Sequence, residues 1–457
     1  MLIYNIMRNI KKKTIIVFSF IVLTSLLSSF NVSSSDIHSF SNNNLELPDS
    51  YIIKDVPYVS QETNFFCSYA SSTMVFKYYG INLSLEDVLY HTGVGYSTIY
   101  RNKQNFRIPR PGWFNCQTSL TYEFISDLYG LSYEPCLVDS DLSDKEQWIK
   151  EWTNIKQNIS NDIPIVAYVD ELVLAADNLG FGIFYPLLKN SNLIFGHAVT
   201  ILGYNETNQS ICYNDPIYGV YDKSDYGIYR WADVEKFKTS TRRISNTMWV
   251  HLFIDISEKP VLIEEAFNRS HKRNIEKLKG NSSIYSDNMG KAENTSFGIN
   301  AVRRLRQDFD KGINNRVFTF YKYKLYNRFG LIYSLMNYLH KRYSSVFKIT
   351  LDMIVLDDND IYTNIAGEKN FTADYLNKMK NTLSNENLSE ICEYESTLFK
   401  YEAENWTKMA EYYSEFRKKG IFMPLLQGLN IMNKMADALD NIIAIEEAII
   451  SGPPEEK

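Results

Sequence analysis

The stretch VPYVSQETNFFCSYAS, residues 56–71, decides the fold because it places a cysteine at the expected start of a helix. The following residues, Tyr69–Tyr79, have helical character and stop at Gly80. At a helix start, free backbone N–H groups and the positive end of the helix dipole favour a thiolate over a thiol. Cys67 is therefore the candidate nucleophile, although a cysteine considered alone is more often a buried structural residue.

Gln61 lies six residues before Cys67 in the same stretch. Its side-chain amide can donate a hydrogen bond to the oxyanion that forms when a thiolate attacks a carbonyl group. The backbone N–H of Cys67 can donate a second hydrogen bond to the same oxygen. One short segment thus supplies both a candidate nucleophile and a candidate oxyanion hole.

A thiolate of this kind needs a proton acceptor, and the chain has six histidines. His197 opens the β-rich run Ala198–Tyr204, so a rigid sheet would hold its ring in place. His91 follows a helix and is more simply a helix cap, and His251 lies inside an apolar strand and is more simply a core or sheet residue. The other three lie outside the expected catalytic core. We therefore predict that His197 is the base.

A turn follows Tyr204, and a second β-rich run then ends at Asp215. If the two runs form an antiparallel hairpin about residue 207, Asp215 returns to the level of His197 and can orient its ring. Asn214 has suitable chemistry for the same role, but neighbouring residues on a strand face opposite sides. Only one of the two can reach the ring, and we favour Asp215.

Helices precede strands in the first half of the chain, which predicts an α+β fold with an antiparallel sheet. Ser84 and Asp87 have the spacing of a capping box at the start of the second helix. A third helix is expected at 118–128, and Trp148, Trp152 and Ile155 recur at helical spacing in a fourth. The expected strands cover residues 165–169, 197–204, 211–215 and 248–256.

A chain of 457 residues is expected to hold two or three domains, at about 100 to 200 residues each. We predict a signal peptide over residues 1–35, a catalytic domain over 36–258, a linker over 259–296 and an all-helical domain over 297–457. The linker prediction rests on the polar stretch 281–296, which lacks periodicity. Helices of the last domain are expected at 298–309, 330–343, 396–419 and 430–451.

The N-terminus has the pattern of an export signal, with Arg8 and Lys11–Lys13 ahead of the short apolar run Thr14–Leu27. This run is shorter than the about 20 residues of a comfortable membrane span. We therefore expect a secreted, extracellular protein, with a membrane anchor only if this segment is not cleaved.

The five cysteines are an odd number, which in an exported protein leaves at least one thiol unpaired or shared between chains. Cys116 and Cys136 are the nearest candidates for a disulfide. The formal net charge of -6, without a basic block after the first residues, argues against a nucleic-acid partner. No His/Cys/Asp cluster predicts a metal and no Gly-rich loop predicts a nucleotide, so no cofactor is expected.

Three motifs resemble the bacteriocin-leader-processing branch of papain-like cysteine peptidases: Val-Pro-Tyr-Val-Ser-Gln-x5-Cys-x-x-Ala-Ser, Gly-His-Ala-Val-x-x-x-Gly-Tyr and Asn-Asp-Pro. The resemblance implies a papain-like fold for about Val56–Ile256, with Gln61, Cys67, His197 and Asp215 as site residues. Ser68-Tyr69 stands in place of the common Gly-Pro after the cysteine. That departure concerns the shape of the first helical turn rather than the thiol chemistry.

Shorter motifs resemble proteins of the butirosin-biosynthesis acyltransferase type, and they extend over most of the chain. They are SLEDVLY at 84–90, GVGY at 93–96, PIVAYVD at 164–170 and GINAVRR at 298–304. This resemblance implies the same thiol chemistry, used to move an acyl group from a carrier protein to an amine.

The function predicted from these patterns is a secreted cysteine peptidase or amidase that forms an acyl-thioester on Cys67, with a peptide or amide as substrate. An acyltransferase shares that thioester and resolves it with an amine instead of water. Export favours hydrolysis, because acyl-loaded carrier proteins are cytoplasmic. An inactive module that binds a peptide is the alternative from another class. The role of the helical domain stays open: it could cover the site, restrict substrates or bind a protein partner.

Overall fold

The computed structural model describes eleven stretches of the chain, which all belong to one compact unit, Leu47–Lys457. They are residues 47–62, 66–101, 119–136, 142–174, 194–221, 224–245, 248–256, 260–285, 295–315, 359–419 and 425–454. The signal peptide, the helix expected at 330–343 and Cys116 lie outside these stretches. The export signal and the Cys116–Cys136 disulfide therefore stay predictions, as does the division into domains.

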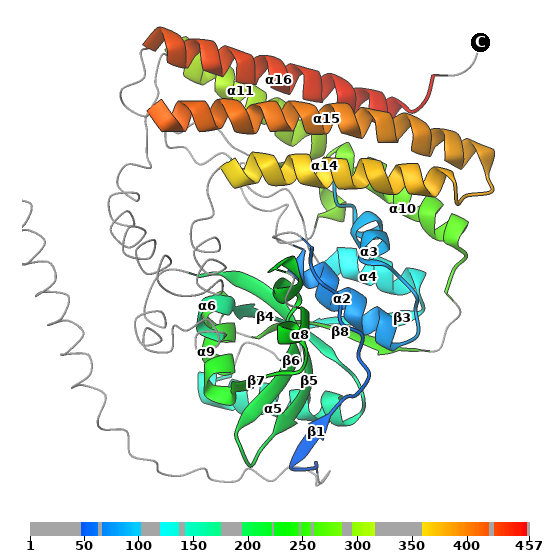
Figure 1. The fold of residues 1–457 in the computed structure, drawn as a ribbon, viewed down its shortest axis with the longest axis vertical. Helices are drawn as coiled ribbons and strands as arrows, with labels where there is room; N and C mark the ends of the chain where they lie inside the picture. The colour runs from blue at the N-terminus through cyan, green and yellow to red at the C-terminus, as the bar shows by residue number, and fades with distance from the viewer. Residues whose placement is uncertain are drawn as a thin grey trace, which may run out of the picture. The chain divides into compact units, whose positions relative to one another are not determined.

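An antiparallel sheet of seven strands forms the centre of the first half (Figure 1). Its order is β3-β8-β4-β5-β6-β7, and β1 pairs with β5 off this path. The strands are β1 (Ser50–Ile52), β3 (Leu131–Cys136), β4 (Ile165–Asp170), β5 (Gly196–Asn205), β6 (Ser210–Asn214), β7 (Arg230–Asp233) and β8 (Trp249–Asp255). The four strands predicted from the sequence are all present, and the mixture of helices with an antiparallel sheet confirms the α+β class.

Several helices surround this sheet, and the four predicted from the sequence are among them. They are α2 (Cys67–Tyr78), α3 (Leu85–Thr92), α4 (Ser119–Leu128), α5 (Asp144–Ser160), α6 (Glu171–Leu174), α8 (Ser224–Gly227), α9 (Val234–Ile244) and the 3-10 helix η2 (Pro216–Tyr221). The capping box of α3 is confirmed. Asp87 N–H donates to Ser84 Oγ at 3.1 Å, and Ser84 N–H donates to Asp87 Oδ2 at 2.8 Å.

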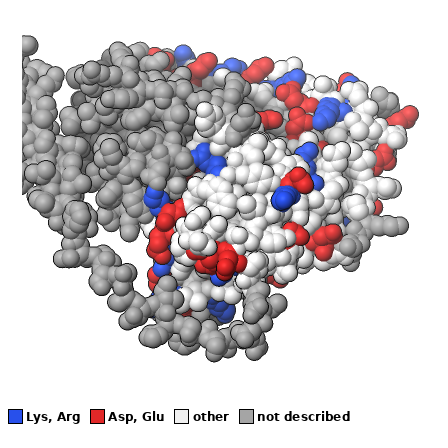
Figure 2. Space-filling model, turned by 60° about the horizontal axis from the view of Figure 1, so that its bottom comes forward, with Lys and Arg blue, Asp and Glu red and all other residues white. Residues whose placement is uncertain are grey.

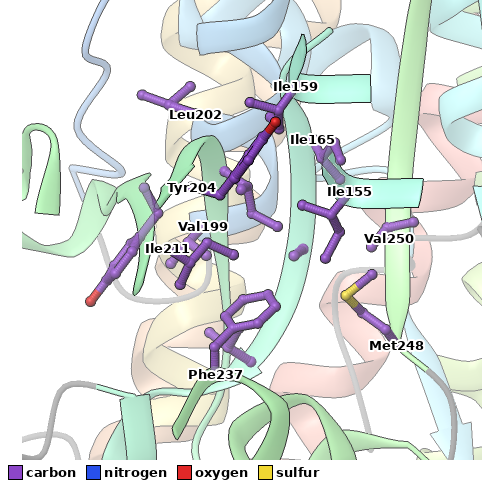
Figure 3. Packing of buried hydrophobic residues seen from close by; sticks show 14 of the residues in the cluster. Ile155, Ile159, Ile165, Val199, Leu202, Tyr204, Ile211, Phe237, Met248 and Val250 are labelled. Carbon is purple, nitrogen blue, oxygen red and sulfur yellow. The ribbon is translucent and has the colours of Figure 1, made fainter. Parts of the chain in front are cut away.

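Both faces of the sheet are covered, and alternate residues of the central strands pack on opposite sides. On one side Ile155 of α5 and Phe237 of α9 pack against Val199 and other strand residues (Figure 3). On the other side Val166 and Ala198 belong to a second apolar cluster, with residues of α2, α3 and α4. Burial on both faces explains why β4 and β5 are nearly continuous apolar runs in the sequence.

The described residues beyond 260 are mostly helical. They form α10 (Ile263–Leu278), η3 (Ser282–Ile284), α11 (Gly298–Asn315), α14 (Asn359–Lys380), α15 (Glu386–Lys419) and α16 (Leu425–Ser451). Helices α11, α14, α15 and α16 lie side by side (Figure 1). The range expected to be a linker, 259–296, contains α10, η3 and the short strand β9 (Thr295–Phe297). Helix α10 forms there because its apolar face packs on α3 and α16, contacts that the local sequence does not display.

Aromatic packing joins the helical segment to the sheet-containing half. Tyr90 of α3 stacks on Phe267 of α10 at 5.0 Å and on Tyr375 of α14 at 4.6 Å between ring centroids. Strand β9 pairs with β2 (Ile99–Arg101) as a second, two-stranded sheet. Phe371 of α14 lies edge-on to Phe66, 5.9 Å between centroids, directly before Cys67. Helix α14 therefore packs next to the segment that carries the candidate nucleophile.

On the face shown in Figure 2, small groups of acidic and basic side chains alternate with broad uncharged areas. In the part of the chain that the structure describes, no helix has both the length and the apolar character that crossing a bilayer requires.

Candidate active site

Cys67 is the first residue of α2, as the sequence predicts. The N-cap residue is Phe66, and no described side chain caps this helix start, so no described capping group competes for the backbone N–H groups of the first turn. Thr200 Oγ1 of β5 donates to the carbonyl of Ser71 at 3.1 Å, and Ser71 Oγ donates to the carbonyl of Ala198 at 3.2 Å. These bonds fix the first turns of α2 over β5, the strand that begins beside His197.

The first turn of α2 is regular despite the Ser68-Tyr69 pair that departs from the peptidase motif. Ser68 is fully buried, and its hydroxyl shares a hydrogen bond of 2.8 Å with the Tyr122 hydroxyl of α4. Cys67 is a free thiol, as are Cys212 and Cys392. The nucleophile candidate is therefore available for chemistry in this structure.

His197 and Asp215 form a buried pair. The ring Nε2 of His197 lies 2.8 Å from Asp215 Oδ1, and both side chains are almost completely buried. A ring N–H at Nε2 donates to the carboxylate in this arrangement. The other ring nitrogen, Nδ1, is then left for Cys67, whose interaction with His197 contributes to raising the pKa of the histidine.

Asp215 reaches His197 from just beyond the end of β6. The predicted hairpin is present, with Asn205 opposite Ser210 and Thr200 opposite Asn214. Asp215 thus leaves the strand before it reaches the level of His197, and the turn into η2 completes the distance. The N–H of Ile217 donates to Asp215 Oδ1 at 3.1 Å and fixes that turn.

Other contacts hold the Asp215 backbone and turn Asn214 away from the histidine. Tyr58 OH donates to the Asp215 carbonyl at 2.9 Å, and Asp215 N–H donates to the Gly227 carbonyl at 2.8 Å. A Cβ at Gly227 would come within 2.4 Å of the Asp215 carbonyl, so only glycine permits this approach. Asn214 Oδ1 accepts from the N–H of Tyr229 at 2.8 Å. Of the two residues considered, Asp215 is the one that contacts the ring.

The electrostatic surroundings of His197 favour its protonated form. Burial by itself lowers the pKa of a histidine. At His197 that effect is outweighed by the charge of Asp215, by the hydrogen bond with Asp215 and by the interaction with Cys67, which together raise the pKa well above its ordinary value. A protonated His197 can pair with a thiolate at Cys67.

Gln61 is buried, and its backbone contacts the turn that follows Asp215. Its N–H donates to the carbonyl of Pro216 at 3.1 Å, and Pro216 directly follows Asp215. The structure therefore brings the loop of Gln61 next to the turn that carries Asp215. Its role as an oxyanion donor remains a proposal.

The sequence analysis missed Glu171, a fully buried acid at the start of α6. One side-chain oxygen of Glu171, one ring nitrogen of His197 and one oxygen of Asp215 lie within 4.8 Å of one another. Strand pairing explains this position, because Val169 lies opposite His197 and Glu171 comes two residues later. A prediction that β4 pairs with β5 would have found it.

Glu171, His197 and Asp215 are close enough to hold a metal ion. Nε2 of His197 and Oδ1 of Asp215 already bond to each other, however, so an ion would have to break that hydrogen bond. The arrangement is better suited to holding a proton on the imidazole than to ligating a metal.

A pocket of about 710 Å³ lies elsewhere in the described part of the chain. Its lining includes Tyr79, Asp162 and Asp255, near the start of β4. His197 lies opposite Val169, at the other end of that strand, and Asp215 contacts it there. The pocket therefore does not identify the chemical site, and the side-chain geometry does.

Residues 53–246 match a family model described as the Peptidase_C39 like family. The matched segment is less than half of the chain and contains Gln61, Cys67, His197 and Asp215. The match supports a C39-type papain-like peptidase family for this segment, and it suggests a papain-like fold and hydrolase chemistry. The resemblance to the butirosin-biosynthesis type is not shown by it. A search of curated proteins found no match.

Proposed function

We propose, from the similarity of residues 53–246 to C39-type cysteine peptidases, that this chain is a thiol hydrolase, a peptidase or amidase acting through Cys67. The observation that carries the proposal is the His197–Asp215 pair, with its remaining ring nitrogen available to a free thiol at a helix start. This is the order of nucleophile, base and orienting group that covalent catalysis by a thiol requires.

In the proposed reaction the Cys67 thiolate attacks the substrate carbonyl carbon, and a C–S bond forms while the carbonyl oxygen becomes an oxyanion. The N–H of Cys67 and the amide of Gln61 donate to that oxygen. Protonated His197 gives its proton to the leaving amine as the C–N bond breaks. Neutral His197 then takes a proton from water, which attacks the thioester and releases the acid and Cys67.

The proposed location outside the cell rests on Arg8, Lys11–Lys13 and the apolar run that follows them. An acyltransferase would form the same thioester and pass the acyl group to an amine. Adding a primary amine to an assay separates the two reactions, because only transfer gives an amide product.

The test is the rate of Cys67 alkylation by iodoacetamide as a function of pH, read for each cysteine by peptide mass spectrometry. We expect fast labelling of Cys67 well below about pH 8.5, where an ordinary thiol ionises, and loss of this reactivity in His197→Ala. Cys212 and Cys392 are internal controls, because burial raises the pKa of each to about 12. Labelling of Cys67 with the pH profile of an ordinary thiol would contradict the enzyme proposal and favour a binding module.

A further inference from the structure

Glu171 occupies a position that no step of the proposed reaction uses. Its N–H donates to the carbonyl of Phe195 at 3.0 Å, which holds the start of α6 against the start of β5. Its side chain is fully buried, and among the described residues neither carboxyl oxygen has a hydrogen-bond partner. The second oxygen of Asp215, Oδ2, is likewise buried without a described partner. Two carboxyl groups therefore lie close together in a buried site, and each has an oxygen without a hydrogen-bond partner among the described residues.

Two buried carboxyl groups this close retain one proton between them, so that one group is neutral and the other is an anion. Ionising both would place two like charges together in a low dielectric. Asp215 is the one suited to be the anion, since it accepts from His197 and from the N–H of Ile217. The pKa of Glu171 is raised well above its ordinary value, first by burial and then by the charge of Asp215, against the opposing effects of His197 and Arg230. The proton therefore belongs on Glu171.

The charges around the site also balance when Glu171 is neutral. The groups that face it or its neighbours are Asp215, His197, Asp170, Arg230, Tyr213 and Tyr218, with Arg243 paired to Asp170. Burial raises the pKa of both tyrosines, so they are neutral. The Cys67 thiolate, Asp215 and Asp170 are then matched by the cations His197, Arg230 and Arg243. An ionised Glu171 would add an unmatched buried charge, which is costly.

We propose that Glu171 is a protonated positioning residue that donates its proton to Oδ2 of Asp215, so that Oδ1 stays directed at His197. One oxygen of Glu171 and one oxygen of Asp215 lie within 4.8 Å of each other without a hydrogen bond, so this bond requires the two carboxyl groups to approach each other. The inference rests on the proposed function, because the histidine that Asp215 orients is the base of that reaction. Glu171 acts through Asp215 and does not contact the reacting atoms.

The first test is the infrared difference spectrum between the wild type and Glu171→Gln at neutral pH. We expect the difference spectrum to show the loss of the carbonyl stretch of one protonated carboxylic acid, because other buried acids that hold a proton, such as Glu446, are present in both proteins and cancel. Glu151→Gln is the matched control, because Glu151 is also buried but accepts from Arg242 and lies on α5. The carbonyl band assigned to protonated Glu171 should remain in the spectrum of Glu151→Gln. Glu171→Asp should shift the band and provides the assignment if the glutamine variant does not fold.

The second test is Cys67 alkylation at neutral pH. Glutamine keeps a neutral hydrogen-bond donor, so Cys67 alkylation in Glu171→Gln should stay within about threefold of the wild-type rate. In Glu171→Leu the donor is lost, so the rate of Cys67 alkylation should fall by about tenfold or more. The absence of a protonated-acid band from the difference spectrum of Glu171→Gln, or alkylation in the glutamine variant as slow as in the leucine variant, would overturn the inference. If wild-type Cys67 shows no enhanced reactivity, the proposed function fails, and the infrared band still decides the protonation of Glu171.

Discussion

His197 experiences two opposing electrostatic effects, and their balance decides whether the site can work. Removing an imidazolium from water disfavours its charge, whereas the adjacent anion Asp215 and the interaction with Cys67 favour it. The favourable effects win, so the pKa is raised. The imidazolium is therefore present at neutral pH and is lost only as the pH rises through that raised pKa.

Asp215→Asn should lower the pKa of His197, because asparagine keeps a hydrogen-bond acceptor but removes the charge that stabilises the imidazolium. We expect a fall of about one pH unit or more, equivalent to about 1.4 kcal/mol per unit. The upper pH limit of the thiolate–imidazolium pair moves down by the same amount. The measurement is an NMR titration of histidine ring protons in protein labelled at histidine.

The control for this substitution is Asp162→Asn, which removes an acid that accepts from Tyr51 near the start of β4, away from the site. It should leave the His197 titration unchanged. An unaltered His197 pKa in Asp215→Asn would mean that the carboxylate does not support the imidazolium.

Among the elements, α14 has polar side chains on its buried face, as α15 and α16 also do. Lys369 is completely buried and lies 2.7 Å from Glu402 of α15 and 3.4 Å from Glu446 of α16. Glu368 and Thr372 are buried beside it on the same helix. These residues interrupt the apolar stripe by which a helix is recognised in a sequence. That interruption weakens the helical pattern of α14, which was not predicted from the sequence.

Glu446→Gln should flatten the pH dependence of stability. Burial first, and then Glu402, raises the pKa of Glu446 to about 8, against the opposing effect of Lys369. Between its unfolded pKa of about 4.3 and about 8 the folded state therefore binds more protons, and the free energy of unfolding falls by up to about 1.4 kcal/mol per pH unit. The variant lacks the contribution of Glu446 to this pH dependence of the free energy of unfolding. Urea unfolding at several pH values between 5 and about 8 measures it.

Glu447→Gln is the matched control, because it makes the same chemical change at the next residue of α16, where the side chain is half exposed. It should leave the slope as it is in the wild type. Equal slopes for the wild type and Glu446→Gln would show that Glu446 does not hold its proton at neutral pH.

At the scale of the whole molecule, the helical segment packs directly on the half that carries the site. Thr372 Oγ1 of α14 donates to the Val94 carbonyl at 2.9 Å, just after α3. Gly95 follows, and a Cβ there would lie 2.0 Å from Thr372 Oγ1 and 2.9 Å from Thr372 Cβ. This close approach makes Gly95 a probe of the contact between the two segments.

Gly95→Ala should destabilise the protein more than Gly80→Ala. Both glycines have positive φ, +84° and +78°, so each alanine variant bears left-handed strain of about 1–2 kcal/mol. Nothing lies within 4 Å of a Cβ at Gly80, whereas at Gly95 the clash with Thr372 should add about 1–3 kcal/mol. Urea unfolding followed by circular dichroism measures both. Equal losses in the two variants would show that α14 does not pack on this turn in solution.

Local sequence determined the parts of this protein that depend on neighbouring residues along the chain. The capping box of Ser84, the start of α2 at Cys67 and the β5–β6 hairpin all follow from short-range patterns. The hairpin and the turn after it bring Asp215 to His197. These features could be predicted because each depends on spacing, capping or turn chemistry within a few residues.

Tertiary structure alone decided the features that depend on distant partners. Helix α10 occupies a range expected to be a linker, because its apolar face finds α3 and α16. Glu171 becomes part of the site only because β4 pairs with β5 and places it beside His197 and Asp215. Its burial and its neighbouring carboxylate set its protonation, and neither is visible in the sequence around it. Short-range sequence patterns therefore identified the candidate residues, and tertiary packing determined how their charges are arranged in space.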